Sequence, residues 1–454
     1  MQHCLKMFSV RRKVKDTMLN YQSYDVAVMN YPLFQRNTPK INFCEIVEAK
    51  SIEKDYKVPI YIHIPFCENL CKFCIYNRMR VKKDSEIVER YVNSLIREIK
   101  LYASFESIRK MKIGAVFIGG GTPTVLSFQQ LYGLLKALSE NFAMDDCEIT
   151  VECNVQNGDI EKLKLLKTLG VNRISTGMQT FHEETRKRLN IQCDSKTVSR
   201  WMDKAAALHF DEIATDIIYG FPGLLEKQVL EDINLALKLP IQHLSLYKLT
   251  VFAYTELYRD MQKAQESLHS EENMEKLFSL AHAYLLEKGF QVYSTQEYGS
   301  DVKFWKYTYD GYGNNLSFGS SCFGYLNGYC YQNDSNVMEY IKKCEANCSG
   351  IERISSKITQ NQLMERTMVI GFRKGAVSDA MFYNTFGCHI DAVFEDILAK
   401  HVKEGYIYRD NDKYRLTAKG YFYQGKVSAD YMVSIFKGVS PLMKKMCIGE
   451  HSMP

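Results

Sequence analysis

Residues 58–80 read VPIYIHIPFCENLCKFCIYNRMR. The apolar, β-branched run Val58 to Ile64 predicts a buried strand that ends at Pro65, because proline has no N–H for a ladder. Three cysteines follow in a C-x3-C-x2-C spacing: Cys67, Cys71 and Cys74. Thiolates suit zinc or iron–sulfur clusters, but structural zinc takes four protein ligands and this stretch supplies three. A cubane cluster held by three cysteines would leave one iron open. The spacing alone also allows a zinc site whose fourth ligand comes from another part of the chain, or cysteines that bind no metal.

The composition fits a large domain with one or two smaller ones. The chain has 454 residues, 46% of them apolar, and no apolar run long enough to span a membrane. The 14 cysteines are scattered and no secretory signal is evident, so we expect a cytoplasmic protein. The net charge of 58 − 53 = +5 is modest, so we expect no nucleic-acid partner, although a mildly positive cleft would suit an anionic substrate.

Strands and amphipathic helices alternate from residue 58 to about residue 255. The predicted strands cover residues 58–64, 115–118, 148–152, 171–179, 212–219 and 243–250, each followed by a helix or helix-forming stretch. Six such steps predict an α/β fold, a partial (β/α)6 TIM-type barrel with a parallel sheet and right-handed crossovers. Functional residues of such barrels lie at the carboxyl ends of the strands.

Polar or flexible residues follow several of these predicted strands. The segment GGGTPT (residues 119–124) follows the second strand, and its glycines would let the backbone approach a ligand closely. Glu152, Gln179 and Asp216 are expected to end the third, fourth and fifth strands. A tight turn or a strand-end cap remains the alternative for each of them.

Four stretches resemble a known family. YIHIPFCENLCKFC, GGGTPT, NRISTGMQTF and DIIYGFPG are similar to the motifs of the radical S-adenosylmethionine (SAM) superfamily, in the form carried by its HemN/HemW-type group. That group includes oxygen-independent coproporphyrinogen III dehydrogenases, haem chaperones and class C radical SAM methyltransferases. The resemblance covers residues 58–436 and is strongest in the barrel.

The resemblance implies two cofactors and a set of residues that hold them. Cys67, Cys71 and Cys74 would bind a [4Fe-4S] cluster, whose fourth iron would bind the amino and carboxylate groups of SAM. The protein would bind either one or two SAM molecules. The family's SAM pocket maps onto Gly119, Gly120, Gly121, Thr122, Glu152, Gln179 and Asp216, with Tyr61 and Phe73 near the cluster and adenine. His63 lies in the same motif. The role of a core histidine on the buried strand is as much expected for it as a role in the site.

The function implied is that of an oxygen-independent coproporphyrinogen III oxidase. Such a radical SAM enzyme cleaves SAM reductively and acts on a tetrapyrrole or similar large planar substrate, with flavodoxin or ferredoxin as electron donor. No residue is assigned a catalytic role. The alternatives are a class C methyltransferase or cyclopropanase, a haem-degrading enzyme, or a non-catalytic haem chaperone.

Three sequence features bear on this choice. Tyr76 stands where the dehydrogenases carry an additional cysteine, and Ile191 where the family usually has an arginine, so both departures weaken the dehydrogenase assignment. The pair Tyr31–Pro32 resembles an N-terminal segment of the dehydrogenases and favours an enzyme.

The predicted organisation has four parts. Residues 1–56 form an N-terminal lead-in segment, 57–255 the radical SAM barrel and 256–359 a bridging segment, while 360–454 form a HemN-type, winged-helix-like domain over the barrel mouth. In the bridging segment, an aromatic group could line a cleft for a flat ligand, although core packing is the commoner role of such residues: Trp305, Tyr307, Tyr309 and Tyr312.

Overall fold

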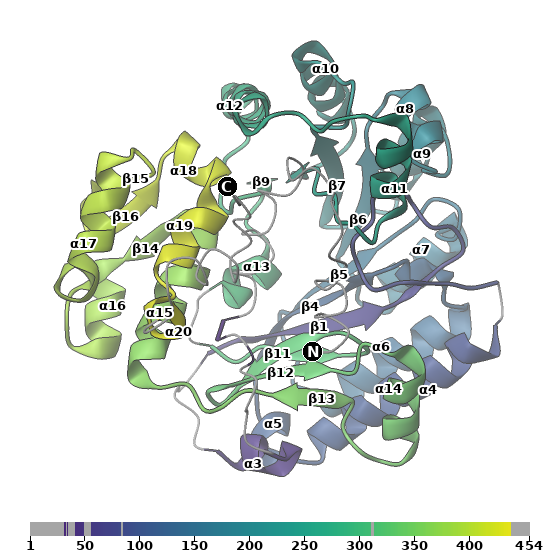
Figure 1. The fold of residues 1–454 in the computed structure, drawn as a ribbon. Coiled ribbons are helices and arrows are strands. Elements are labelled where there is room, and N and C mark those ends of the chain that lie inside the picture. Colours follow the sequence, from purple (N-terminus) through teal and green to yellow (C-terminus); the bar gives the residue numbers. More distant parts are fainter. Residues whose placement is uncertain are drawn as a thin grey trace.

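The computed structural model describes residues 31–32, 34, 41–49, 56–82, 85–309 and 313–436. A curved sheet with helices on its outer side forms the larger part, and a smaller helical domain lies opposite the sheet's open side (Figure 1). This confirms the predicted α/β class and the partial barrel.

The main sheet has eight strands in the order β10-β1-β4-β5-β6-β7-β8-β9. Its six central strands are those predicted, and all of them run parallel. They are β1 (Val58–Ile64), β4 (Ile113–Gly120), β5 (Glu148–Glu152), β6 (Arg173–Gln179), β7 (Glu212–Tyr219) and β8 (His243–Lys248).

Helices cover the outer face of the sheet because each has one apolar side. In β1, for example, Ile60, Ile62 and Ile64 are fully buried in the main core, whereas Tyr61 belongs to the aromatic cluster of the inner side. The covering helices are α4 (Glu86–Ala103), α6 (Phe128–Asn141), α7 (Ile160–Thr168), α8 (Glu183–Arg188), α9 (Ser195–Ala206), α10 (Glu226–Ala236) and α12 (Glu271–Glu287). Ser127 caps α6 by accepting a hydrogen bond from the backbone N–H of Gln130.

The bridging segment contributes strands to both edges of the barrel sheet, which the sequence did not predict. β9 (Glu297–Gly299) pairs antiparallel with β8, and β10 (Leu316–Phe318) pairs parallel with β1. The segment also supplies α11 (Glu256–Ala264), the short helix α13 (Lys303–Thr308), the sheet β11 (Phe323–Leu326), β12 (Tyr329–Asn333) and β13 (Ile351–Ile354), and α14 (Val337–Glu345). The barrel therefore extends beyond residues 57–255, and the four-part division stays a prediction.

Glu98 fastens the bridging segment to the barrel. This fully buried carboxylate of α4 accepts hydrogen bonds from the backbone N–H groups of Gly319 (3.0 Å) and Gly350 (3.1 Å). It also accepts from Asn333 Nδ2 at 2.9 Å and from the Tyr340 hydroxyl at 2.7 Å. Burial raises the pKa of Glu98 to about 7.

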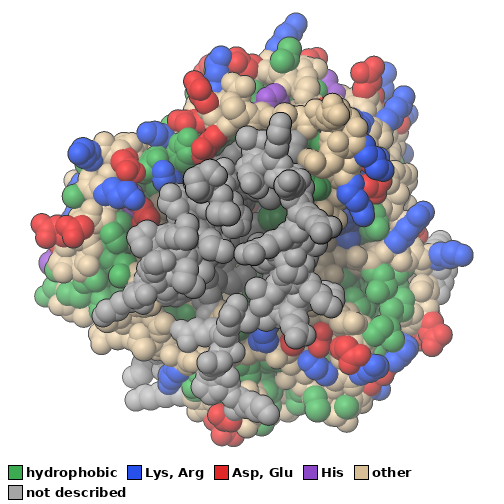
Figure 2. Space-filling model, viewed as in Figure 1, with side chains coloured by type: hydrophobic (Ala, Val, Ile, Leu, Met, Phe, Trp, Pro, Cys, Tyr) green, Lys and Arg blue, Asp and Glu red, His purple; other side chains and the backbone are tan. Residues whose placement is uncertain are grey.

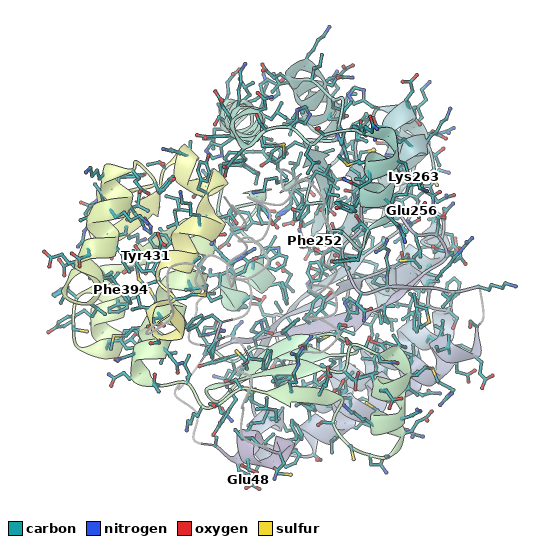
Figure 3. All side chains as sticks on the ribbon, in the orientation of Figure 1. Glu48, Phe252, Glu256, Lys263, Phe394 and Tyr431 are labelled. Carbon is teal, nitrogen blue, oxygen red and sulfur yellow. The ribbon has the colours of Figure 1, made fainter. Side chains whose placement is uncertain are left out.

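The C-terminal domain is winged-helix-like. Helices α15 (Gln360–Gly371), α16 (Asp379–Phe386) and α17 (Ile390–Lys403) pack with a sheet of β14 (Ala376–Ser378), β16 (Lys413–Leu416) and β15 (Ile407–Asp410). Three short helices follow: α18 (Ala418–Phe422), α19 (Gln424–Asp430) and α20 (Val433–Phe436). Phe394 and Tyr431, labelled in Figure 3, form an edge-to-face pair in its core, with ring centroids 5.3 Å apart.

Tyr31 anchors part of the N-terminal segment to this domain. The residue is fully buried, its hydroxyl donates to the Glu365 carboxylate and its carbonyl accepts from Arg366. Helix α3 (Phe43–Glu48) packs on α5 (Glu106–Arg109). Residues 1–30, 33, 35–40 and 50–55 of the predicted lead-in segment lie outside the described residues.

Positive and negative side chains are interspersed on the face seen in Figure 2. Among the described residues, none of the helices combines the length and apolar character that a membrane span needs.

Candidate functional site

The three cysteines lie on one loop at the carboxyl end of β1. Cys67 belongs to β2 (Phe66–Cys67), which pairs in parallel with β3 (Met79–Arg80) and so closes the loop at its base. The backbone N–H of Met79 donates to Pro65 at 2.6 Å and that of Val81 donates to Cys67 at 2.9 Å. Cys71 and Cys74 occupy the part of the loop between these two short strands.

Contacts from three parts of the chain fix the cysteine loop. The amide of Asn190, which follows α8, donates to the Leu70 carbonyl at 2.9 Å. Asn77 Nδ2 donates to Ser321 Oγ in the bridging segment at 2.6 Å. Lys72 pairs with Asp260 of α11 at 2.6 Å, and its carbonyl accepts from Leu257 N–H at 3.0 Å. A loop held this firmly is organised to present ligands.

Figure 3 shows Phe252 on the inner side of the loop that leads into α11, with Glu256 at the start of the helix. Phe252 stacks on Tyr254, with ring centroids 5.5 Å apart. The Tyr254 hydroxyl donates to the Ile75 carbonyl at 3.0 Å. Tyr254 therefore ties the segment that leads into α11 to the cysteine loop, and Phe252 packs against its ring.

Burial raises the pKa of each of the three thiols, to about 11 for Cys67 and about 12 for Cys71. Among the described residues, no three His, Cys, Asp or Glu side chains gather as they would around a single metal ion. A cubane cluster takes one thiolate per iron, so its ligands need not converge on one point. Because a metal site requires thiolates, cluster binding would release protons from these thiols.

Arg78 spans two of the cysteines, a role that the sequence did not reveal. Its Nη2 donates to the Cys71 carbonyl at 2.9 Å and its Nη1 donates to the Cys74 carbonyl at 2.5 Å. Its Nε is buried and has no hydrogen-bond partner among the described residues. A buried N–H without an acceptor is unusual, and it suits a site whose acceptor arrives with a ligand.

The glycine segment after β4 lies directly against the cysteine loop. The backbone N–H of Gly121 donates to Ile64 at 2.7 Å, and that of Thr122 donates to Phe66 at 2.8 Å. The Thr122 hydroxyl donates to Cys67 Sγ at 3.4 Å. Thr122, predicted as part of a SAM pocket, is therefore also a hydrogen-bond donor to a candidate cluster ligand.

Packing within the protein already accounts for much of the need for glycine here. A Cβ on Gly119 would lie 2.8 Å from the Glu152 carboxyl group, and one on Gly121 would lie 2.7 Å from the Phe66 carbonyl oxygen. Gly120 has φ +109°, and its Cβ would lie 2.4 Å from His63 Nδ1. His63 in turn lies between Tyr61 and the Asn77 carbonyl, which supports its role as a core residue.

Glu152 and Gln179 end β5 and β6 as predicted, but Asp216 does not end β7. Asp216 lies in the middle of that strand, which continues through the apolar residues Ile217, Ile218 and Tyr219. Gln179 has φ +67°, and its amide occupies the space left by the missing side chain of Gly177, which pairs with Asp216. The three polar residues therefore come from neighbouring strands, with Asp216 deeper in the barrel.

The two acids have elevated pKa values. Burial, and then the negative charge of Asp216, raise the pKa of Glu152 to about 7. Burial, and then Glu297, raise the pKa of Asp216 to about 6. Perturbed carboxyl groups of this kind concentrate at functional sites, although structural networks also produce them.

A buried polar layer below these acids was not predicted. Arg173 pairs with Glu212, and His243 contacts the Glu297 carboxylate at 2.5 Å and the Tyr293 hydroxyl at 2.7 Å. Glu297 belongs to β9, an edge strand that the sequence did not predict, so this network could not be predicted either. It provides charged groups below the site in an otherwise apolar barrel.

Aromatic residues flank the site on two sides. Tyr61 stacks on Phe117 with ring centroids 6.2 Å apart, and α13 packs beneath them against β1 and β4. Phe73 meets Phe221 edge to face at 6.1 Å, and Ile191 packs in the same apolar cluster. Ile191 thus makes an apolar contact, while more than half of the Tyr76 side chain is exposed.

Trp305 stacks on Tyr309 with centroids 5.4 Å apart, and the Arg373 guanidinium of the C-terminal domain lies 5.1 Å from the Tyr309 ring. This aromatic pair therefore joins α13 to the C-terminal domain. Tyr309 is buried, so core packing describes it better than a ligand cleft does, and Tyr312 of the same predicted group lies outside the described residues.

A separate cavity lies between the barrel and the C-terminal domain. It contains none of the predicted site residues. Its lining residues are Tyr219, Leu246, Lys248, Phe278, Thr295, Gln296, Arg373, Tyr421, Phe422 and Gln424.

Two family descriptions match this chain. The one described as the Radical SAM superfamily matches residues 61–236, and the one described as the HemN C-terminal domain matches residues 358–423. The first covers the strands and loops of the site, and the second most of the winged-helix-like domain.

Curated relatives carry more than one name. The chain is 30% identical to the heme chaperone HemW of Bacillus subtilis over 83% of this chain and 98% of that protein. It is 27% identical to the anaerobilin synthase of Escherichia coli O157:H7, over 70% of this chain and 72% of that one. It is 26% identical to the oxygen-independent coproporphyrinogen III oxidase of Escherichia coli K12, over 80% of this chain and 82% of that protein.

A solved structure has the same fold. Coproporphyrinogen III oxidase (HemN) from Escherichia coli superposes with a TM-score of 0.75 over 96% of this chain and 100% of that chain, at 20% identity. Membership of the radical SAM superfamily implies a [4Fe-4S] cluster and SAM, and the three thiols with the unpaired Arg78 N–H fit such a cluster. The chain belongs to the HemN/HemW-type group of the radical SAM superfamily.

Proposed function

We propose that this chain is a radical SAM enzyme of the oxygen-independent coproporphyrinogen III oxidase type that acts on a tetrapyrrole or a similar large planar substrate. The observation that carries this proposal is the pair of buried acids with raised pKa values, Glu152 and Asp216, beside a fixed three-cysteine loop.

The cluster and SAM, when bound, supply the reducing electron and the 5′-deoxyadenosyl radical. The chain's own residues bind and orient. Cys67, Cys71 and Cys74 would hold the cluster, and the Glu152 and Asp216 carboxylates would accept hydrogen bonds from the amino and hydroxyl groups of SAM. The same pocket would be lined by Gly119, Gly120, Gly121, Thr122 and Gln179, with Tyr61 and Phe73 at its aromatic walls.

The names of the relatives support the substrate class. One is named for coproporphyrinogen, one for anaerobilin and one for heme, all tetrapyrroles. The C-terminal domain faces the open side of the barrel (Figure 1), where it would help to exclude water from a radical intermediate. Flavodoxin or ferredoxin is the electron donor that we propose.

A haem chaperone is the second candidate. It is favoured by the 30% identity to HemW over nearly all of that protein, and by Tyr76 at the position of the additional cysteine. In that case the cysteine loop would still hold the cluster, but the barrel acids would have no catalytic task.

The two candidates differ in what the loaded protein produces. The reconstituted protein is incubated anaerobically with SAM, a reductant and coproporphyrinogen III, and the products are separated by chromatography. An enzyme forms 5′-deoxyadenosine and protoporphyrinogen. A chaperone forms neither, binds haem stoichiometrically and transfers it to an apo-haemoprotein.

A further inference from the structure

We propose that Arg78 is a positioning residue that raises the reduction potential of the cluster held by the cysteine loop. This inference rests on the proposed cluster. It concerns a residue that lies outside the three ligands and outside the SAM pocket. Its guanidinium bridges the Cys71 and Cys74 carbonyls at 2.9 and 2.5 Å, so its position relative to two ligands is fixed.

The unpaired donor of Arg78 is the first argument. Its Nε is buried and finds no acceptor among the described residues, although both Nη atoms are bonded. A buried N–H without a partner destabilises a protein unless something accepts it. The sulfurs of a cluster are such acceptors, and hydrogen bonds to them raise its potential. Thr122, which donates to Cys67 Sγ at 3.4 Å, would act in the same direction.

The charge of Arg78 is the second argument. A guanidinium stays protonated in proteins, so its positive charge is permanent. Both of its Nη atoms lie within hydrogen-bond distance of ligand carbonyls, those of Cys71 and Cys74, so the charge is held beside the cysteine loop. Reduction adds one electron to the cluster and breaks no bond. A fixed positive charge therefore stabilises the reduced state more than the oxidised state.

A redox titration of Arg78→Gln, free of SAM and followed by the EPR signal of the reduced cluster, tests this role. We expect a midpoint potential at least 59 mV below that of the wild type, which is a tenfold change in the ratio of reduced to oxidised cluster for one electron. Arg78→Lys keeps the charge and should shift the potential less. Arg80→Gln is the matched control, because exposed Arg80 donates to the Glu68 carbonyl instead, and its potential should equal the wild type's.

The outcomes separate this inference from the proposed function. A wild-type protein that binds no iron overturns the cluster and this inference with it. A loaded Arg78→Gln protein with the wild-type potential overturns only the role of Arg78. If Arg78→Gln cannot be loaded, Arg78→Lys decides: a potential below that of the wild type supports the redox role, because lysine keeps the charge but has no Nε donor. A potential equal to that of the wild type, or loss of iron from both variants while Arg80→Gln stays loaded, overturns the redox role and leaves Arg78 a purely structural one.

Discussion

Gly120 donates its backbone N–H to the carboxylate of Glu152 at 2.9 Å, which joins the end of β4 to the end of β5. The bond brings the glycine segment, the acid and the cysteine loop into one site. It also means that changes at Gly120 alter the protein's own packing before they affect any ligand.

Gly120→Ala is expected to destabilise the protein strongly. The residue has φ +109° and a Cβ would meet the His63 ring, which is held between Tyr61 and Asn77. Backbone strain of about 1–2 kcal/mol and overpacking of about 1–3 kcal/mol should add, and the iron content should fall as the loop loosens. Chemical unfolding measures the change. Gly170→Ala is the control, since its φ of +89° is similar but nothing lies within 4 Å of its Cβ. Equal losses in the two variants would contradict the packing account.

Glu152→Gln should weaken SAM binding and flatten its pH dependence. The pKa of Glu152 is raised to about 7, so its carboxyl group is neutral below that pH and gains its charge as the pH rises. The affinity of the loaded wild type for cationic SAM should therefore increase between pH 6 and pH 8. The variant should bind roughly tenfold more weakly at pH 8, about 1.4 kcal/mol, in equilibrium dialysis.

Glu161→Gln serves as the control for this measurement, because Glu161 is an exposed acid of α7 paired with Lys164. Its SAM affinity should follow the wild-type curve. A Glu152→Gln protein with wild-type affinity at both pH values would remove Glu152 from the pocket.

Glu98→Gln should change how stability depends on pH. The pKa of Glu98 is raised to about 7 from an ordinary value of 4.5, so the folded protein holds a proton that the unfolded chain has lost. Glu98 therefore makes the wild-type free energy of unfolding fall, by up to about 3 kcal/mol, as the pH rises from about 4.5 to 7. The variant lacks this contribution. The amount by which the variant's free energy of unfolding lies below that of the wild type should therefore shrink from pH 5 to pH 8, as measured by guanidinium titrations.

Exposed Glu89 on the same helix provides the comparison. Glu89→Gln should differ from the wild type by a constant amount across this range. A deficit of Glu98→Gln that stays constant or widens with pH would show that the Glu98 carboxyl group ionises normally.

Replacement of Cys67, Cys71 and Cys74 together by alanine should abolish the cluster. The wild type is expected to bind about four irons per chain after anaerobic reconstitution, with the absorption of a [4Fe-4S] cluster. A triple variant in which Cys44, Cys348 and Cys388 are replaced tests cysteines outside the loop and should load normally. Iron retained by the loop variant would mean that another cysteine set holds it.

The six central strands could be predicted because each contains several apolar or β-branched residues and pairs with the next of the six along the chain. The edge strands β9 and β10 could not, since each has three residues and its pairing depends on distant segments. The same distinction applies to the site. Cysteine spacing and the glycine segment are local signals. The contacts of Arg78 with the cysteine carbonyls depend on how the loop closes on itself, and the contact of Asn190 with Leu70 depends on how the loop lies against the residues that follow α8. The sequence also misplaced Asp216 because the apolar residues after it extend β7.

The formation of 5′-deoxyadenosine per cluster, by reconstituted protein with SAM and a reductant in the presence of coproporphyrinogen III or haem, tests the central claim most directly. The wild type should form it, and Asp216→Asn should form it at least tenfold more slowly while its iron content is unchanged, a loss of about 1.4 kcal/mol of transition-state stabilisation. The asparagine keeps the shape of a residue buried inside the barrel but removes its negative charge. A wild type that forms no 5′-deoxyadenosine with either compound, yet binds haem stoichiometrically, would contradict the enzyme assignment and establish the chaperone in its place.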